Sequence, residues 1–440
     1  MRIGIDGYNL AIPNGTGVAT YGFSLAKVVA DMGHVPEGIF GIDPGPELAN
    51  RETLFFERFG RGDARGHLRQ RVRNAFLLNP FGTRGLLPIP LTDHVDKRSF
   101  GPRWPDFQAL WTSPLLFEFA TARFAALRHF TTVAMPDPPA VMHWTYPVPL
   151  RMAGSRNIYT IHDLVPLKLP HTTLDNKTHY RRLIERILRQ GDHVLTVSEA
   201  SRGDILAMFD ADPTRVTNTY QSSPVPAAIA RSSEADDQAS IEGLFGLPPR
   251  GFYLLFGASD PKKNIGRMVD AYLASQSQRP LVVVSSRDWG MTEATGGLGK
   301  DGSIYGRKSD RSIVQLQYLP RETLFRLIRS ARAVLFASLY EGFGLPALEA
   351  IQLGTPVISS TTSSLPEVVG EGGLLVDPYD TAAITEAIRA IDGDDALVAR
   401  LSAAGMAHSA LFTNGAFTER LHRAYARAGI IAGEHPSIGV

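Results

Sequence analysis

The segment from Glu341 to Glu349 combines residue types that suit a phosphorylated ligand with hydroxyl groups. The loop Gly342-Phe343-Gly344 stands ahead of Pro346, a residue favoured in the first turn of a helix. Such a loop presents consecutive backbone N–H groups, and the helix dipole behind it also attracts anions. The two carboxylates can accept hydrogen bonds from ribose or pyranose hydroxyls. Either glutamate alone would be explained as an acid favoured by the dipole, so the interpretation depends on their combination.

A run of alternating strands and helices is predicted to position this segment. The expected strands are short apolar stretches at 252–256, 281–284, 333–336, 356–358 and 374–376. Gly257 ends the first of them, and Lys263 lies between that strand and a helix with an apolar stripe. Asp380 is a natural N-cap for the helix that follows the last strand. This half of the chain is predicted to form a doubly wound α/β domain.

The first half of the chain indicates a second domain of the same class. A strand at 2–5, a turn at 14–17 and a helix bearing Tyr21 and Leu25 form the usual opening unit of a parallel sheet. The later strands are expected at 140–144, 157–161 and 193–197, and a helix is expected at 177–189. The stretch 44–114 gives no clear element. Residues 222–240, rich in Ser, Pro and Ala, are predicted to be the linker.

Composition excludes several classes of protein. The 440 residues are 44% hydrophobic and 20% charged, as in an ordinary globular chain, and the net charge of +1 gives no case for nucleic-acid binding. The absence of cysteine excludes disulfide scaffolds, thiolate zinc sites and cysteine nucleophiles. The N-terminus lacks a signal-peptide pattern, and no apolar run of about 18 residues is present. A soluble, cytoplasmic protein is expected.

The sequence resembles the retaining nucleotide-sugar glycosyltransferases of family 4. Glu341 and Glu349, with seven residues between them, look like the signature of that family. Further blocks resemble the family's motifs in the family's order: 161–166, 197–201, 260–264, 363–370 and 373–378. The resemblance covers the first forty residues and most of 140–430. It implies a GT-B fold, in which two Rossmann-like domains face each other across a cleft and the C-terminal helix packs back toward the N-terminal domain.

The resemblance also implies the site residues. His162, Glu341 and Lys263 are the expected catalytic residues: His162 lines the sugar-transfer site, Glu341 holds the sugar, and Lys263 neutralises the diphosphate. Glu349 is expected to hold the ribose hydroxyls. The complete set of expected donor contacts is Gly15, Thr16, Gly17, Gly257, Lys262, Tyr318, Leu319, Gly342, Phe343, Gly344, Leu345 and Glu349. No metal or other cofactor is expected.

The sequence departs from the family on the acceptor side. Tyr8 stands where the family usually has an arginine, and Val18-Ala19-Thr20 replaces its Ile-Gly-Arg. The expected division is an N-terminal acceptor domain at 1–225 with an irregular insertion at 50–135, a donor domain at 226–414, and a C-terminal helix and tail at 415–440. The arginines of 51–76, interleaved with phenylalanines, fit either peripheral contact with an anionic membrane or a solvated charged face.

The expected function is transfer of a hexose from a nucleotide sugar to a glycan or lipid-linked acceptor, in bacterial surface polysaccharide or O-antigen synthesis. The block at 162–166 resembles mannosyl- and deoxyhexosyl-transferases, so a GDP-linked mannose-type donor is favoured over a UDP-sugar. A nucleotide-sugar 2-epimerase of the same fold is the alternative. A Rossmann dehydrogenase is disfavoured because Gly15-Thr16-Gly17-Val18-Ala19-Thr20 lacks the third glycine of the dinucleotide fingerprint.

Overall fold

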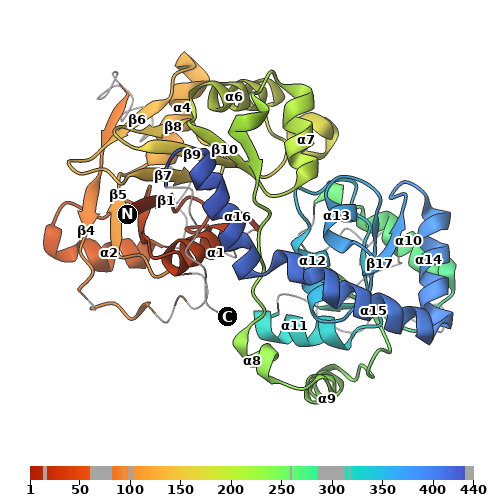
Figure 1. Ribbon diagram of the computed structural model, residues 1–440. Helices are drawn as coiled ribbons and strands as arrows, with labels where there is room; N and C mark the ends of the chain where they lie inside the picture. Colours follow the sequence, from red (N-terminus) through yellow and green to blue (C-terminus); the bar gives the residue numbers. More distant parts are fainter. Residues whose placement is uncertain are drawn as a thin grey trace. The chain divides into compact units, whose positions relative to one another are not determined.

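The computed structural model describes residues 1–12, 17–59, 82–92, 94–97, 100, 104–257, 260–285, 313–316 and 319–431. The chain divides into two compact units (Figure 1). Unit 1 comprises Met1–Leu164, Asp175–Ser222 and Asn414–Val440, and unit 2 comprises Val165–Leu174 and Ser223–Thr413. The sequence places the boundary between 225 and 226, and the structure places it between Ser222 and Ser223.

Unit 1 is built on a parallel sheet with one antiparallel edge strand. The strand order in its described part is β11-β10-β9-β7-β1-β2-β5-β4, and β4 is antiparallel to β5. The strands are β1 (Arg2–Asp6), β2 (Val35–Phe40), β4 (Leu87–Ile89), β5 (Ala109–Thr112), β7 (Val141–Trp144), β9 (Arg156–Ile161), β10 (His193–Thr196) and β11 (Val216–Asn218). β1 lies between β2 and β7, and its Ile3 and Ile5 are fully buried.

The first helix of unit 1 follows its predicted apolar stripe. Tyr21, Leu25, Val28 and Val29 of α1 (Gly17–Asp31) are all buried, as the 3.6-residue period predicts. The other α-helices among the described residues of this unit are α2 (Arg51–Arg58), α4 (Leu116–Leu127), α6 (Lys177–Gln190), α7 (Glu199–Met208) and α16 (Asn414–Arg427). The last of these, α16, belongs to unit 1 and packs on α1, where Phe417 contacts Tyr21 (Figure 1). The expectation that the C-terminal helix returns to the N-terminal domain is confirmed.

The stretch 50–135, expected to be irregular, contains regular elements where the structure describes it. Besides α2, β4, β5 and α4, it holds β3 (Thr83–Gly85) and β6 (Thr131–Ala134), which with β8 (Leu150–Met152) form a small parallel sheet. The sequence pattern missed these strands because each has only three or four residues, too few for a period to be recognised.

The phenylalanines of the expected membrane-contact stretch lie inside unit 1. Phe55, Phe56 and Phe59 surround Trp104, with ring centroids 4.9 Å apart for Phe56 and 5.1 Å for Phe59, and all three are buried. These rings cannot face a lipid surface, which corrects that part of the prediction. The arginines at 61–73 lie outside the described residues. Among the described helices, none is long and apolar enough to cross a bilayer.

Unit 2 contains a wholly parallel sheet in its described part, in the order β14-β13-β12-β15-β16-β17. Its strands are β12 (Tyr253–Phe256), β13 (Leu281–Val284), β14 (Ile313–Leu316), β15 (Ala333–Phe336), β16 (Val357–Ser360) and β17 (Gly373–Val376). Its α-helices are α5 (Val165–Lys168), α8 (Ala227–Arg231), α9 (Glu234–Phe245), α10 (Ile265–Ser275), α11 (Arg321–Ser330), α12 (Leu345–Gln352), α13 (Leu365–Val369), α14 (Thr381–Gly393) and α15 (Asp395–Ser409). The side chain of Asp380 caps α14, as predicted.

The predicted linker 222–240 is wrong beyond its first residues, because α8 and α9 lie within it. α9 packs on α11, where the buried carboxylate of Asp237 forms ion pairs with Arg326 at 3.2 Å and with Arg329 at 2.5 Å. Ser233 caps the helix by accepting from the backbone N–H of Asp236. A charged contact therefore holds α9 to the domain, and hydrophobic periodicity does not detect a helix held in this way.

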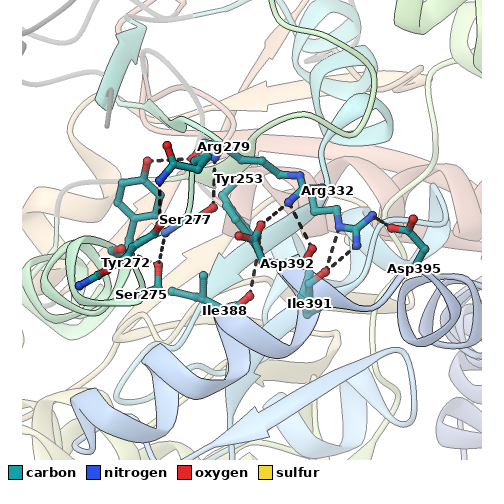
Figure 2. Close-up of polar contacts among 12 residues, drawn as sticks. Tyr253, Tyr272, Ser275, Ser277, Arg279, Arg332, Ile388, Ile391, Asp392 and Asp395 are labelled. Atoms are coloured by element: carbon teal, nitrogen blue, oxygen red, sulfur yellow. Dashed lines mark hydrogen bonds and ion pairs between the residues drawn. The ribbon is translucent and has the colours of Figure 1, made fainter. Parts of the chain in front are cut away.

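Polar side chains join the sheet of unit 2 to α14 and α15 (Figure 2). The Tyr253 hydroxyl donates to the Ile388 carbonyl at 3.0 Å, and Arg279 pairs with Asp392 at 2.5 Å. Arg332 donates to the Ile391 carbonyl and pairs with Asp395 at 2.5 Å. Tyr253 begins β12 and Arg332 precedes β15, so these contacts lie at the amino ends of the strands. They stabilise the edge of the sheet opposite to the one where ligands of open α/β sheets bind.

Candidate functional site

The turn that bears Lys263 is fixed at the carboxyl ends of the strands of unit 2. Gly257, at the end of β12, has φ of 136°, which favours glycine. The short turn Pro261–Lys263 is capped by Asp260 and ends at Asn264. The Asn264 amide donates to the carbonyls of Ala337 at 3.0 Å and Pro378 at 2.7 Å, which follow β15 and β17. Lys263 is therefore anchored to three strands.

Lys263 and Glu341 form a nearly buried ion pair. The Lys263 Nζ lies 2.6 Å from Glu341 Oε1 and 4.8 Å from the centre of the Phe336 ring. Burial acts to raise the pKa of Glu341, but the charges of Lys263 and Lys262 outweigh it, so the pKa lies below its ordinary value. The site thus holds an ionised carboxylate beside an ammonium, both at the same strand edge.

The loop between Glu341 and α12 has a defined shape. The Glu341 N–H donates to Ser363 Oγ at 2.9 Å, and the Ser364 hydroxyl is shared between the carbonyls of Glu341 and Phe343 at 3.0 and 2.7 Å. Gly344 caps α12 with φ of 108°, and a Cβ there would come within 2.6 Å of Leu365. The serines and the glycine together fix the backbone at the helix N-terminus, as the predicted anion site requires.

Three further residues expected to contact the donor, Phe343, Leu345 and Leu319, differ in what they expose to a ligand. The Phe343 ring is buried against Phe412, with centroids 5.5 Å apart, so Phe343 offers a ligand its backbone and not its ring. Leu345 is the first residue of α12 and is half-buried, and Leu319 lies two residues ahead of α11 and is also half-buried.

Glu349, a residue of α12, lies in a second buried cluster. Its Oε1 accepts from the Ser223 hydroxyl at 2.8 Å and lies 3.5 Å from Arg321 Nη2. Burial raises the pKa of Glu349, although the Arg321 charge and the Ser223 hydrogen bond act against this rise. The same Arg321 nitrogen donates to Ser223 Oγ and to the Pro224 carbonyl, both at 3.2 Å.

Arg321 and Ser223 are absent from the sequence-predicted set. Arg321 is the first residue of α11 and follows Leu319 and Pro320, a segment expected to contact the base. Its place next to this segment is the one feature of the sequence that could have pointed to Arg321, because no motif includes it. Ser223 is the first residue after the division between the units.

In unit 1, His162 follows β9 and is fixed by one backbone contact. Its Nε2 lies 2.8 Å from the Thr145 carbonyl, an acceptor, so Nε2 carries the hydrogen and Nδ1 keeps its lone pair in the neutral ring. Burial lowers the pKa of His162, which favours that neutral form. The ring of Tyr21 meets the imidazole edge-on at 5.0 Å.

Asp6 holds the two strand ends beside this histidine. Its Oδ1 accepts from the Tyr8 N–H at 3.2 Å, and its Oδ2 accepts from the Thr145 N–H. The carboxylate is fully buried at the carboxyl end of β1. Because the Thr145 N–H donates to Asp6 and the Thr145 carbonyl accepts from His162, the backbone of this one residue connects the two side chains. The sequence analysis did not single out Asp6 as a site residue.

Some predicted residues fall outside this account. Gly15, Thr16 and Tyr318 lie outside the described residues, and Gly17 is the first residue of α1. Lys262 is half-buried and acts on the site through its charge on Glu341. Within the described ranges, no group of three or more His, Asp or Glu side chains could hold a metal ion.

Comparison with known proteins places these features in a family. Residues 300–407 match the family described as glycosyl transferases group 1. The chain is 31% identical over 268 residues to O-antigen chain mannosyltransferase B of Escherichia coli, covering 59% of this chain and 67% of that protein. It is 25% identical to the serotype-specific mannosyltransferase WbdA of the same species, covering 61% of this chain but only a third of WbdA.

A solved structure shares the fold. Sucrose-phosphate synthase from Thermosynechococcus elongatus superimposes with a TM-score of 0.63 at 18% identity, over 97% of this chain and 98% of that one. The expected α/β class with two Rossmann-like domains of GT-B type is confirmed. The chain belongs to the group 1 glycosyl transferases.

Proposed function

We propose that the protein is a retaining mannosyltransferase that uses a nucleotide sugar, GDP-mannose in preference to a UDP-sugar, and extends a glycan or lipid-linked acceptor in bacterial surface polysaccharide synthesis. The support is family membership together with relatives named as mannosyltransferases, one of them specifically of the O-antigen chain. These relatives match this chain over part of their length, so the substrates belong to the proposal. The 2-epimerase is not favoured, because the relatives are transferases.

The observation that carries the proposal is that each glutamate of the signature segment lies beside a cation, Glu341 in the loop ahead of α12 and Glu349 within that helix. Lys263 stands 2.6 Å from Glu341, and Arg321 stands 3.5 Å from Glu349. An ammonium with three donors can transfer its hydrogen bond from Glu341 to a donor phosphate. Glu341 is then available to a sugar hydroxyl, while Glu349 accepts from the ribose.

The chemistry proposed is departure of the sugar from its pyrophosphate. Negative charge grows on the phosphate oxygens as the bond breaks, and a fixed cation and backbone amides at the N-terminus of α12 stabilise it there. The acceptor hydroxyl attacks on the leaving-group face, and a donor phosphate oxygen takes its proton. His162, neutral and oriented by Thr145, is proposed to contact the transferred sugar. No metal is required by this scheme.

The test begins with nucleotide binding. We expect GDP to raise the unfolding temperature more than UDP, dTDP or ADP, since a ligand at 100 times its Kd stabilises a protein by about 2.7 kcal/mol. Incubation of GDP-mannose with a mannosylated acceptor in EDTA should then give an α-linked product, as read by the anomeric signals in NMR. Epimerised nucleotide sugar without a glycosidic product would favour the epimerase, and a product of inverted configuration would refute retention.

A further inference from the structure

Two tyrosines lie together at the carboxyl edge of the sheet in unit 1. Tyr8 comes two residues after the end of β1, and Tyr146 two residues after the end of β7, the neighbouring parallel strand. Their ring centroids are 6.4 Å apart with the planes tilted by 34°. Ligands of open α/β sheets bind outside this edge. Two strand ends thus present an aromatic pair where a ligand is expected.

The aromatic pair is both supported and accessible. Behind Tyr8 the buried ring of Phe117 packs at 4.8 Å. Tyr8 is half-buried, whereas Tyr146 remains 36% exposed. The Asp6 carboxylate fixes the backbone beneath both rings, because it accepts from the N–H of Tyr8 and from that of Thr145, the residue before Tyr146. A buried group therefore fixes part of the backbone that carries the pair.

The negative charges of carboxylates act on both phenol groups. Burial first, and then the negative charge of Glu118, raises the pKa of Tyr8. Burial, followed by the charges of Asp163 and Asp175, likewise raises the pKa of Tyr146. A phosphate or other anion would be repelled from this neighbourhood. The hydroxyls of a neutral sugar, in contrast, can donate to carboxylates, and the C–H face of a pyranose is apolar enough to lie on an aromatic ring.

We propose that Tyr8 and Tyr146 form a subsite that binds a neutral pyranose of the acceptor glycan, stacked on the Tyr146 ring. The proposal rests on the proposed function for the identity of the bound sugar as acceptor. It also gives a physical meaning to the tyrosine that replaces the family's arginine at position 8: an aromatic surface selects an uncharged sugar where a cation would select an anionic one. The adjacent Thr145 carbonyl, which orients His162, links the subsite to the proposed sugar contact.

The probe for the test is a linear α-mannotriose, and binding is measured by saturation-transfer NMR on the full chain. We expect the ring C–H protons of one mannose to receive saturation in the wild type. Tyr146→Ala should weaken binding about tenfold, the effect of losing one aromatic contact together with its buried area. Tyr146→Phe, which keeps the ring, should bind as the wild type does. Tyr379→Ala, at an exposed tyrosine of unit 2, is the matched control and should change nothing.

The outcomes separate the subsite from the proposed function. The subsite is refuted if the wild type does not bind mannotriose, if Tyr146→Ala binds with wild-type affinity, or if Tyr146→Phe loses as much as Tyr146→Ala. It is also refuted if mannose 6-phosphate binds more tightly than mannose. Nucleotide-induced thermal shifts are recorded in every variant. If no nucleotide shifts the wild type, the proposed function fails, whereas loss of mannotriose binding in Tyr146→Ala with an unchanged GDP shift supports the subsite.

Discussion

Replacing Asp6 by asparagine should change how the stability of unit 1 depends on pH. Asp6 is fully buried, and its two oxygens accept from the N–H groups of Tyr8 and Thr145. Burial raises its pKa from 3.8 to about 6, although these hydrogen bonds act in the opposite direction. Asparagine keeps the shape and one acceptor but cannot ionise, so the Asp6→Asn variant removes this titration.

The sign and size of the effect follow from linkage. A carboxyl with a raised pKa keeps its proton in the folded protein at pH values where the unfolded chain has lost it. The stability that Asp6 contributes is therefore complete below pH 4 and is lost as the pH rises through about 6. The difference between 3.8 and about 6 is worth about 3 kcal/mol, at about 1.4 kcal/mol per pKa unit.

Two buried histidines oppose Asp6 in the same pH interval. Burial lowers the pKa of His143 to about 3 and that of His193 to about 4, so both stay neutral in the folded protein. In the unfolded chain the same histidines take up protons as the pH falls below their ordinary pKa of 6.5. Their contribution is complete above pH 6.5 and is lost as the pH falls. The pH dependence of the wild type alone would mix the two effects, and only its difference from Asp6→Asn isolates the carboxyl.

The assay is urea unfolding of both proteins from pH 4 to pH 7, followed by tryptophan fluorescence. Trp104, Trp111 and Trp144 lie in unit 1, so a Trp289→Phe background makes the signal specific for that unit. We expect the free energy of unfolding of the wild type, minus that of Asp6→Asn, to fall by about 2.5 kcal/mol between pH 4 and pH 7, most of the full change. A constant difference, or one that grows with pH, would refute the assignment of a raised pKa to Asp6.

Three further changes test the donor site. Glu349→Gln should raise the donor KM at least tenfold with little change in Tm, since a lost hydrogen bond to a charged group costs about 1.5–3 kcal/mol; an unchanged KM would remove Glu349 from the site. Lys263→Ala should lower kcat/KM and destabilise unit 2 by about 3–5 kcal/mol in urea, because Glu341 is left buried without its partner, and Lys262→Ala is the milder matched control. Arg321→Met should raise the donor KM because Glu349 is displaced, whereas Arg321→Lys should raise it less because the positive charge is kept. Equal KM values for the two variants would contradict a positioning role of Arg321.

Several strands of the two sheets, among them β13 and β15, were predictable because they are fully buried. β13 and β15 lie at the residues expected from their apolar runs, 281–284 and 333–336, and β10 and β17 differ from the expected ranges by one residue at one end. A strand of a parallel sheet that is covered on both faces consists of apolar residues throughout, and such runs stand out against polar surroundings. The helices α1 and α16 were equally visible, since each buries one regular stripe.

Elements held by polar contacts were not predictable in this way. The sequence of α9 shows no apolar period, since the helix is attached to α11 through Asp237 and two arginines. The strands β3 and β6 are too short for a pattern and exist because they pair with each other. Arg321 escaped for a related reason: its partner Glu349 lies 28 residues further along the chain, and a single sequence carries no sign of such a contact.

The two glutamates of the signature segment are alike in residue type and in burial, yet their surroundings separate them. The ammonium of Lys263, in direct contact, holds the pKa of Glu341 below its ordinary value, whereas burial raises that of Glu349 because the nearest guanidinium stands 3.5 Å away. Glu341 is thus a fixed anion whose cation can be shared with an incoming phosphate. Glu349 is an anion kept at an energetic cost, which hydroxyl donors from a ribose would reduce. The same pair of acids can therefore serve two parts of one nucleotide sugar.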